Sequence, residues 1–278
     1  MFEGRKLLIA TKHKKETVIA PIFQKEFGVH CFTSDIFDTD TLGTFSGEIT
    51  RKDDAMTTLR NKCILASKTT NCDLIVASEG SFGPHPTIFF ANADEELIML
   101  KDFKNDFEII AKEISLETNF NGQSIANLEE LLEFATKVYF PSHALIIKSS
   151  EKNGSKIFKD ITSKKQLIDC FKKLKNDFEI LYVETDMRAL HNPTRMKVIE
   201  KATRTLINKI KSLCPNCSQP GFDIVSSKPG LPCNYCSLPT RSTLSHVYQC
   251  KKCQFQEEKM FPRSIQLEDA TYCDNCNP

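Results

Sequence analysis

The sequence predicts an α/β fold, a mixed central sheet flanked by helices, followed by a small cysteine-rich module. Over residues 1–212, short apolar runs alternate with longer amphipathic stretches, the pattern of strands alternating with helices. In the last 65 residues, eight of the 12 cysteines form four C-x-x-C pairs. The length of 278 residues and the 40% hydrophobic content suit one large domain, 1–212, and one small module, 213–278.

The expected elements follow from the apolar pattern in chain order. Strands are expected where short apolar runs lie between turn residues, at Lys6–Ala10, Val29–Thr33, Asp73–Ser78, Thr87–Ala91, Glu96–Lys101, Phe107–Glu113, His143–Lys148 and Glu179–Glu184. Helices are expected at Lys14–Phe27, Asp54–Thr69, Leu128–Lys137, Lys164–Leu174 and Thr194–Ser212. An acidic start favours the second helix, and Asn192-Pro193 is a favourable entry to the last one. The run 87–113 is expected to form an antiparallel meander.

The four C-x-x-C pairs predict two structural zinc sites. A C-x-x-C turn points two thiolates to one side at the spacing of tetrahedral zinc, and two such turns complete a four-cysteine shell. The gaps of 15 residues between the first two pairs and 19 residues between the last two are typical of zinc ribbons. Pairing of consecutive turns is the simpler arrangement, and interleaved pairing stays open. The expected ligands are Cys214, Cys217, Cys233, Cys236, Cys250, Cys253, Cys273 and Cys276.

A shell of four cysteines leaves no open position for a catalytic water, so the zinc ions are expected to fold this double zinc ribbon without doing chemistry. A disulfide framework is disfavoured because no export signal accompanies the cysteines. A redox role is disfavoured because four C-x-x-C copies in a row lack the βαβ context of redox motifs.

The charge balance argues against a strongly basic nucleic-acid binder, because 37 Lys and Arg face 36 Asp and Glu. From Leu213 onward, basic and acidic residues are equal in number, and two zinc–tetrathiolate sites would make the module negative. Nucleic acid is therefore a weakly supported partner, through a local patch at Arg241 or Lys251–Lys252. No apolar run reaches membrane-spanning length, so we expect a cytoplasmic protein with no membrane contact. A homo-oligomer stays open.

A first polar segment, 11–16, follows the first expected strand and leads into a helix. Ligands of α/β sheets collect at the carboxyl ends of strands, and a helix N-terminus with cations beside it suits an anion. Lys12, His13 and Lys15 are the candidate anion ligands here. A solvated basic turn is the alternative.

A second polar segment, 78–86, follows the third expected strand and contains two glycines that permit close approach of a ligand. Ser78 and Ser81 are candidate binding residues, and Glu79 and His85 are candidate catalytic residues. A tight turn would explain the glycines but not the density of functional groups.

A third segment, 184–195, joins the last expected strand to the last helix. Arg188 and Arg195 could bind phosphate through their guanidinium forks, with Asn192 beside them, and Asp186 could hold Mg²⁺. A local salt-bridge network is the alternative. The loop 38–48 offers Glu48 as a further carboxylate, although an ordinary polar loop is the simpler interpretation.

The motifs ATKHKKE, ASEGSFGPHP and YVETDMRALHNPTRMKVIEKA, with the paired cysteine tail, resemble an uncharacterised bacterial domain family without an assigned activity. The first 212 residues more distantly resemble inosine/xanthosine triphosphate pyrophosphatase-like enzymes, through the turn after the first strand, a lysine on the second helix and the acidic turn at Glu79. That resemblance implies that Glu79 and Glu48 hold Mg²⁺. It also implies phosphate contacts from Lys12, Lys15, Lys62 and Arg188. The chain departs from those enzymes in the residues of the first turn, in the last basic segment and in its zinc tail.

These features together predict a Mg²⁺-dependent phosphohydrolase acting on a nucleotide or nucleotide-like phosphate. Glu79, with Glu48 or Asp186, would hold the metal and activate water, and His85 would serve as acid or base. Lys12, Lys15, Arg188 and Arg195 would stabilise phosphate charge. The alternative is a non-catalytic module that binds an anionic ligand, with zinc ribbons that contact protein or nucleic acid.

Overall fold

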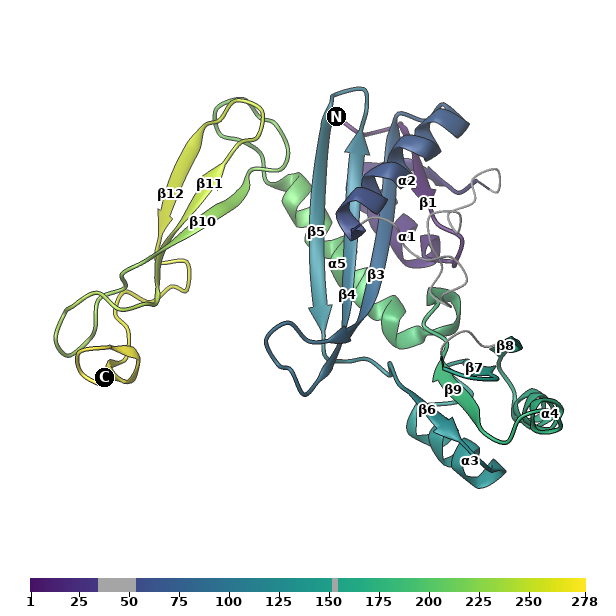
Figure 1. The fold of residues 1–278 in the computed structure, drawn as a ribbon. Helices are drawn as coiled ribbons and strands as arrows, with labels where there is room; N and C mark the ends of the chain where they lie inside the picture. Colours follow the sequence, from purple (N-terminus) through teal and green to yellow (C-terminus); the bar gives the residue numbers. More distant parts are fainter. Residues whose placement is uncertain (35–53, 152–154) are drawn as a thin grey trace. The chain divides into compact units, whose positions relative to one another are not determined.

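The computed structural model describes residues 1–34, 54–151 and 155–278 (Figure 1). It divides into two compact units, Met1–Leu206 and Ile207–Pro278. The division falls inside the long helix α5 (Pro193–Lys211), whose start at Pro193 agrees with the Asn-Pro signal in the sequence. Among the described residues, no helix combines the length and the apolar character that a membrane crossing requires.

The first unit contains a mixed five-stranded sheet in the order β2-β1-β3-β4-β5. β1 (Lys6–Ala10) pairs in parallel with β2 (His30–Phe32) and with β3 (Leu74–Pro84). β3, β4 (Asn92–Asp102) and β5 (Phe107–Ser115) form an antiparallel meander. The mixed sheet and the α/β class predicted from the sequence are confirmed.

Helices lie on both faces of this sheet (Figure 1). α1 (Glu16–Phe27) follows β1, and α2 (Ala55–Thr70) packs Leu59, Cys63 and Ala66 against apolar residues of β1, β3 and β4. The acidic start expected for α2 acts as its cap, because Asp54 Oδ1 accepts hydrogen bonds from the backbone N–H groups of Met56 and Thr57. α5 runs along the opposite face, where Arg195 contacts β4.

Two expectations for the meander are corrected. β3 continues to Pro84, so the glycine-containing segment after Ser78 is strand rather than loop. The expected strand at 87–91 is instead part of the β3–β4 connection. There His85 Nδ1 accepts hydrogen bonds from the backbone N–H groups of Thr87 and Ile88. Phe89 and Phe90 are 87% and 86% exposed, so this apolar run has no face against which to pack as a strand.

A second sheet in the first unit was not predicted. It is antiparallel, in the order β6-β9-β7-β8. Its strands are β6 (Gly122–Ile125), β7 (Leu145–Lys148), β8 (Ile157–Ile161) and β9 (Leu181–Thr185). β6 was missed because its four residues, GQSI, include only one apolar side chain, and β8 was missed because its five residues, IFKDI, lack the apolar–polar alternation of a strand. The last strand before α5 therefore belongs to a different sheet from β1 and β3.

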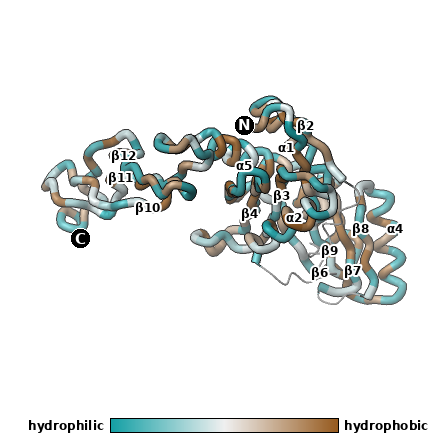
Figure 2. Tube along the Cα trace, turned by 90° about the horizontal axis from the view of Figure 1, so that it is seen from above, coloured by the Kyte–Doolittle hydropathy of each residue, from teal (hydrophilic) through white to brown (hydrophobic). Residues whose placement is uncertain are grey.

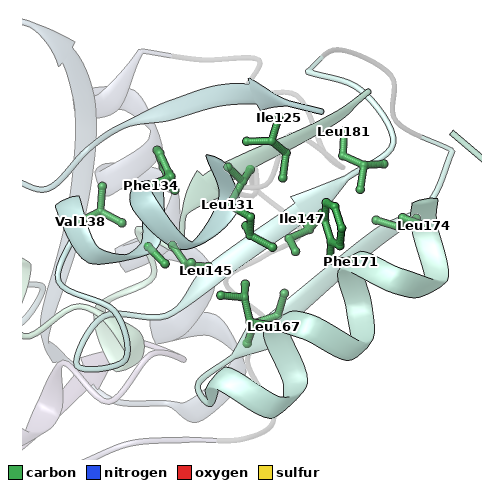
Figure 3. Packing of buried hydrophobic residues seen from close by; sticks show 13 residues of the cluster. Ile125, Leu131, Phe134, Val138, Leu145, Ile147, Leu167, Phe171, Leu174 and Leu181 are labelled. Carbon is green, nitrogen blue, oxygen red and sulfur yellow. The ribbon is translucent and has the colours of Figure 1, made fainter. Parts of the chain in front are cut away.

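Two helices cover this second sheet and share a separate core with it (Figure 3). α3 (Leu128–Lys137) contributes Leu131 and Phe134, and α4 (Lys164–Lys175) contributes Leu167, Phe171 and Leu174. They pack against Ile125, Leu145, Ile147 and Leu181 of the strands. Figure 2 shows hydrophilic residues along the outer side of α4, as expected for a helix with one buried face.

The second unit contains an antiparallel sheet of three strands in the order β10-β11-β12. The strands are β10 (Asp223–Pro229), β11 (Thr243–Gln249) and β12 (Gln256–Met260). The four C-x-x-C turns lie outside these strands, so the strands fix which turns can meet.

Candidate functional site

The site is built where β1 ends and its neighbour β3 continues. Ala10, the last residue of β1, pairs with Ala77, and β3 runs on to Pro84. Ligands of α/β sheets bind outside the carboxyl ends of strands, so this is a position where function is expected. Because side chains of a strand alternate, Ser78 and Gly80 face α5, whereas Glu79 faces α2.

Lys15, at the start of α1, reaches β3 from the turn after β1. Its side chain is buried, and Nζ donates a hydrogen bond to Ser78 Oγ at 2.9 Å. Burial, helped by the positive charge of Arg195, lowers the pKa of Lys15 to about 7. Its amine therefore changes charge near neutral pH.

Lys62 reaches the next residue of β3 from the other face of the sheet. Its Nζ lies 2.5 Å from Glu79 Oε1, and both side chains are buried. Two lysines from distant parts of the sequence, Lys15 and Lys62, thus meet adjacent residues of one strand.

Arg195 is fully buried and ties α5 to the sheet. Its Nε donates to Glu96 Oε1 of β4 at 2.5 Å, and Nη1 donates to the carbonyl oxygen of Met187 at 2.6 Å. The guanidinium carbon lies 5.1 Å from the centre of the Phe82 ring, a cation–π contact. A Cβ on Gly80 would collide with Arg195 Nη2 and Glu96 Oε1, so only glycine fits at this position.

Asp94 completes this buried charged cluster, which we define as Lys15, Lys62, Ser78, Glu79, Asp94, Glu96 and Arg195. Asp94 is 1% exposed, and within the described part of the chain neither of its carboxylate oxygens has a hydrogen-bond partner. Burial, followed by the negative charge of Glu96, raises the pKa of Asp94 to about 8. The carboxyl is therefore mostly protonated at neutral pH.

Sequence reasoning missed Asp94 and Glu96, because the strand was expected to begin at Glu96 and neither carboxylate was considered as a functional group. A usable signal was present. Asp94 and Glu96 are two residues apart, so they share one face of a strand that continues into the apolar run Leu97–Leu100. A pair of acids on a buried face requires cations opposite it, and Arg195 and Lys15 are those cations.

Of the residues predicted from the sequence, Lys15, Lys62, Ser78, Glu79 and Arg195 come together in the cluster. Ser81 lies on the Glu79 face of β3 and lines a pocket of about 240 Å³ with Gly83, Pro86, Ala93, Glu95 and Ile114. Phe82 and Pro84 also line this pocket, so residues from both faces of β3 contribute to it, and Glu79 is not part of the lining.

Other predicted residues lie elsewhere or serve local structure. Lys12 is exposed, and the backbone N–H of His13 bonds to Thr11 Oγ1 within the turn. His85 holds the β3–β4 connection. Asn192 accepts a hydrogen bond from the backbone N–H of Arg195 and donates to Asn119 Oδ1, so it orders the start of α5.

Asp186 and Arg188 form a second polar group at the end of β9. Arg188 donates to both oxygens of Asp186 and to Asp160 Oδ1, and His191 Nε2 lies 2.7 Å from the same Asp160 oxygen. Asp160, Asp186 and His191 are close enough to hold a metal ion, but the Arg188 guanidinium already engages both carboxylates. This is the salt-bridge network that the sequence analysis gave as the alternative.

The carboxylates expected to hold Mg²⁺ do not form one site among the described residues. Glu79 is ion-paired with Lys62, Asp186 is bound by Arg188, and the two belong to no common group of potential metal ligands. Glu48 lies outside the described residues. Mg²⁺ requires oxygen ligands that converge on one point, so Glu79 and Asp186 do not fit it.

The eight cysteines of the second unit form two four-cysteine clusters, as predicted. Sulfur–sulfur distances of 3.6–3.9 Å across the clusters match the ~3.8 Å that tetrahedral zinc at ~2.3 Å from each sulfur produces. The donor set and its spacing therefore fit structural zinc.

The pairing of the turns is interleaved, which corrects the simpler consecutive arrangement. One cluster is Cys214, Cys217, Cys250 and Cys253, and the other is Cys233, Cys236, Cys273 and Cys276. The first turn precedes β10 and the third joins β11 to β12, so the antiparallel sheet brings them to the same end. The second turn follows β10, whose seven residues span ~24 Å and so separate it from the first.

Comparison with known proteins gives a family without an assigned activity. The family described as a domain of unknown function (DUF6671) matches residues 62–278. A search of curated proteins finds no match. The crystal structure of protein VC0702 from Vibrio cholerae is similar to this chain, with 10% sequence identity and a TM-score of 0.32, over 74% of this chain and 94% of that chain.

Proposed function

The chain belongs to the DUF6671 family, a domain of unknown function, and we propose that its α/β unit binds a phosphorylated small molecule and hydrolyses it at the buried charged cluster. One observation carries the proposal. Lys15 and Lys62 approach adjacent residues of β3 from two faces of the sheet, beyond the carboxyl end of β1. Two buried cations at this position are expected where an anion binds.

The charge of the cluster supports an anionic ligand. Lys15, Lys62 and Arg195 face Glu79, Glu96 and Asp94, which is an equal number of acids and bases. Because the pKa of Asp94 is raised to about 8, its carboxyl is mostly neutral at pH 7, and the cluster then has an excess of positive charge. Burial lowers the pKa of Lys15 to about 7, so its amine is partly neutral at this pH while Lys62 and Arg195 supply positive charge.

The pocket of about 240 Å³ at Ser81–Pro84, further along β3 than Glu79, supports a ligand larger than phosphate itself. Its lining includes Ser81, Phe82, Glu95 and Ile114, so it offers both polar and apolar contacts to a further part of a ligand. A nucleotide is the substrate class that the resemblance to nucleoside-triphosphate pyrophosphatases favours.

Release of phosphate and pyrophosphate from a panel of normal and modified nucleotides, with and without Mg²⁺, tests the proposal. We expect the wild type to release one of them from at least one nucleotide. Lys62→Met is expected to lower kcat/KM by ~100-fold, the effect of losing one preorganised stabilising group. Lys68→Met is the matched control, because Lys68 is an exposed lysine on the same helix. Absence of release by the folded wild type would contradict hydrolysis.

The second candidate function is binding without turnover. It is favoured by the ion pair between Glu79 and Lys62, which occupies the carboxylate expected to act in catalysis. The zinc unit would then contact a protein or nucleic acid, and Tyr235 and Tyr272, 84% and 65% exposed beside the second cysteine cluster, are candidates for that contact. Calorimetric binding of a nucleotide that is not hydrolysed would favour this function.

A further inference from the structure

Lys15 and Ser78 have the geometry of a nucleophile and its base. Lys15 Nζ lies 2.9 Å from Ser78 Oγ, and both side chains are buried. An activated serine requires a base within hydrogen-bond reach, and serine–lysine pairs are among the known arrangements. The sequence analysis assigned both residues to ligand binding only.

We propose that Ser78 is the nucleophile of this site and that Lys15 is its general base, so that hydrolysis passes through a phosphorylated Ser78. The inference rests on the proposed function and names the residues that carry out its chemistry. The groups that it requires, Lys15, Ser78 and Arg195, all belong to the buried charged cluster.

The surroundings of Lys15 suit a base that acts near neutral pH. A lysine at its ordinary pKa of 10.5 is protonated and cannot accept the serine proton, whereas burial lowers the pKa of Lys15 to about 7. The charged groups that act on Lys15 electrostatically come from each neighbouring element. They are Lys62 of α2, Glu79 of β3, Asp94 and Glu96 of β4, and Arg195 of α5.

Arg195 is placed to stabilise the charge that develops on the reacting phosphate. It lies against Gly80, the next residue after Ser78 on the same face of β3. Successive residues on one face of a strand are ~7 Å apart, which is within the reach of a phosphoryl group and its oxygens. Glu96 and the Met187 carbonyl oxygen hold the guanidinium in position, so little reorganisation is needed during reaction.

The reaction balances with these groups and water alone. Ser78 Oγ transfers its proton to the neutral Lys15 amine and forms a bond to phosphorus, and the bond from phosphorus to the leaving oxygen breaks. The Lys15 ammonium donates its proton to that leaving oxygen. A water molecule, deprotonated by Lys15, then attacks phosphorus, the bond to Ser78 Oγ breaks, and Ser78 regains a proton from Lys15.

Labelling with a fluorophosphonate probe tests the inference without knowledge of the natural substrate. The probe forms a stable bond to a nucleophilic serine and releases fluoride, and mass spectrometry of the intact chain and its peptides locates the adduct. We expect one adduct, at Ser78, whose rate of formation rises with pH to a plateau with a midpoint near 7. Ser78→Ala is expected to remove it. Labelling of the wild type at no residue, or equal labelling of Ser78→Ala, would overturn the inference.

Variants of Lys15 test whether this residue acts as a proton acceptor or only through its positive charge. Lys15→Arg keeps the charge but cannot accept a proton, so it is expected to lose labelling by at least ~100-fold, as is Lys15→Met. Lys25→Met on the surface of α1 and Ser124→Ala on β6 are matched controls expected to label as the wild type does. Circular dichroism confirms that each variant is folded. Full labelling of folded Lys15→Arg would show that Lys15 is not the base.

The same variants distinguish failure of this inference from failure of the proposed function. Nucleotide hydrolysis that persists in Ser78→Ala would leave the function standing and exclude the covalent route. Labelling of Ser78 in a protein that hydrolyses no nucleotide would leave the serine–lysine pair standing and exclude the nucleotide substrate.

Discussion

Arg195 of α5 occupies the space beside β3 that a side chain on Gly80 would fill. Gly80→Ala would place a Cβ against the Arg195 guanidinium and the Glu96 carboxylate, which are held by each other and by backbone. We expect this substitution to lower the free energy of unfolding by ~1–3 kcal/mol, the usual cost of overpacking. Urea denaturation followed by circular dichroism measures it. Gly83→Ala is the matched control, because nothing lies within 4 Å of a Cβ there.

Substitution of Arg195 is expected to lower the free energy of unfolding more than substitution of an exposed arginine. Arg195→Met leaves Glu96 buried without its cation, which typically costs ~3–5 kcal/mol. Arg195→Met combined with Glu96→Met is expected to recover part of that loss, because no buried charge is then left alone in the pair. Arg204→Met, which breaks an exposed pair with Glu200 on the same helix, is expected to change stability by less than ~0.5 kcal/mol. Equal losses at Arg195 and Arg204 would contradict this account.

Asp94 is expected to make the folded state less stable as pH rises from 3.8 toward 8. In this range the folded carboxyl keeps a proton that the unfolded chain has lost, because burial raises its pKa from the ordinary 3.8 to about 8. The wild type should therefore lose stability relative to Asp94→Asn over this range. Urea unfolding of both proteins at a series of pH values gives the difference, and a difference independent of pH would contradict the prediction.

Lys15 is expected to make the folded state more stable as pH rises above 7, the opposite of the effect of Asp94. Between pH 7 and 10.5 the unfolded chain binds a proton that the folded Lys15 has lost, so stability rises with pH. The wild type should gain stability relative to Lys15→Met across this range, and the two should run parallel below pH 7. Lys25→Met, an exposed lysine on α1, should show no such trend relative to the wild type.

Zinc content tests the interleaved pairing of the cysteine turns. Cys217 and Cys253 belong to one cluster, so the double variant Cys217→Ser/Cys253→Ser is expected to lose one of two zinc ions per chain. Cys217→Ser/Cys236→Ser affects both clusters and is expected to lose both ions. Elemental analysis of the purified proteins gives the zinc content. Consecutive pairing predicts the reverse result for the two variants.

If the two four-cysteine clusters hold zinc, chelation should act on the second unit, because the clusters join segments that its three short strands alone hold weakly. We expect a strong chelator to increase amide hydrogen exchange in β10–β12 and to leave the core of α3 and α4 protected. Equal effects on both regions would contradict a zinc role confined to this unit.

The elements that the sequence predicted well are those with long periodic patterns. The five helices were placed within a few residues, and Asp54 and Pro193 marked two of their starts. The meander was expected, but its strands extend beyond their apolar residues. Hydrogen bonding to β4 keeps β3 extended through Ser78–Pro84, where the side chains are small or polar. Pairing with β4 therefore decided where β3 ends, and the local hydrophobic pattern of the sequence does not reveal that pairing.

The sequence by itself determined the α/β class, the helices, the eight cysteines of the two clusters and the lysine, serine and arginine residues that meet at β3. These depend on local pattern and on residue chemistry. Only the tertiary structure decided that the chain forms a second sheet, that the cysteine turns pair alternately, and that Asp94 and Glu96 join the cluster. Each of these depends on which segments lie side by side. Strand pairing and the packing of α5 bring together residues up to 99 positions apart, as Glu96 and Arg195 are, and local pattern does not encode such distances.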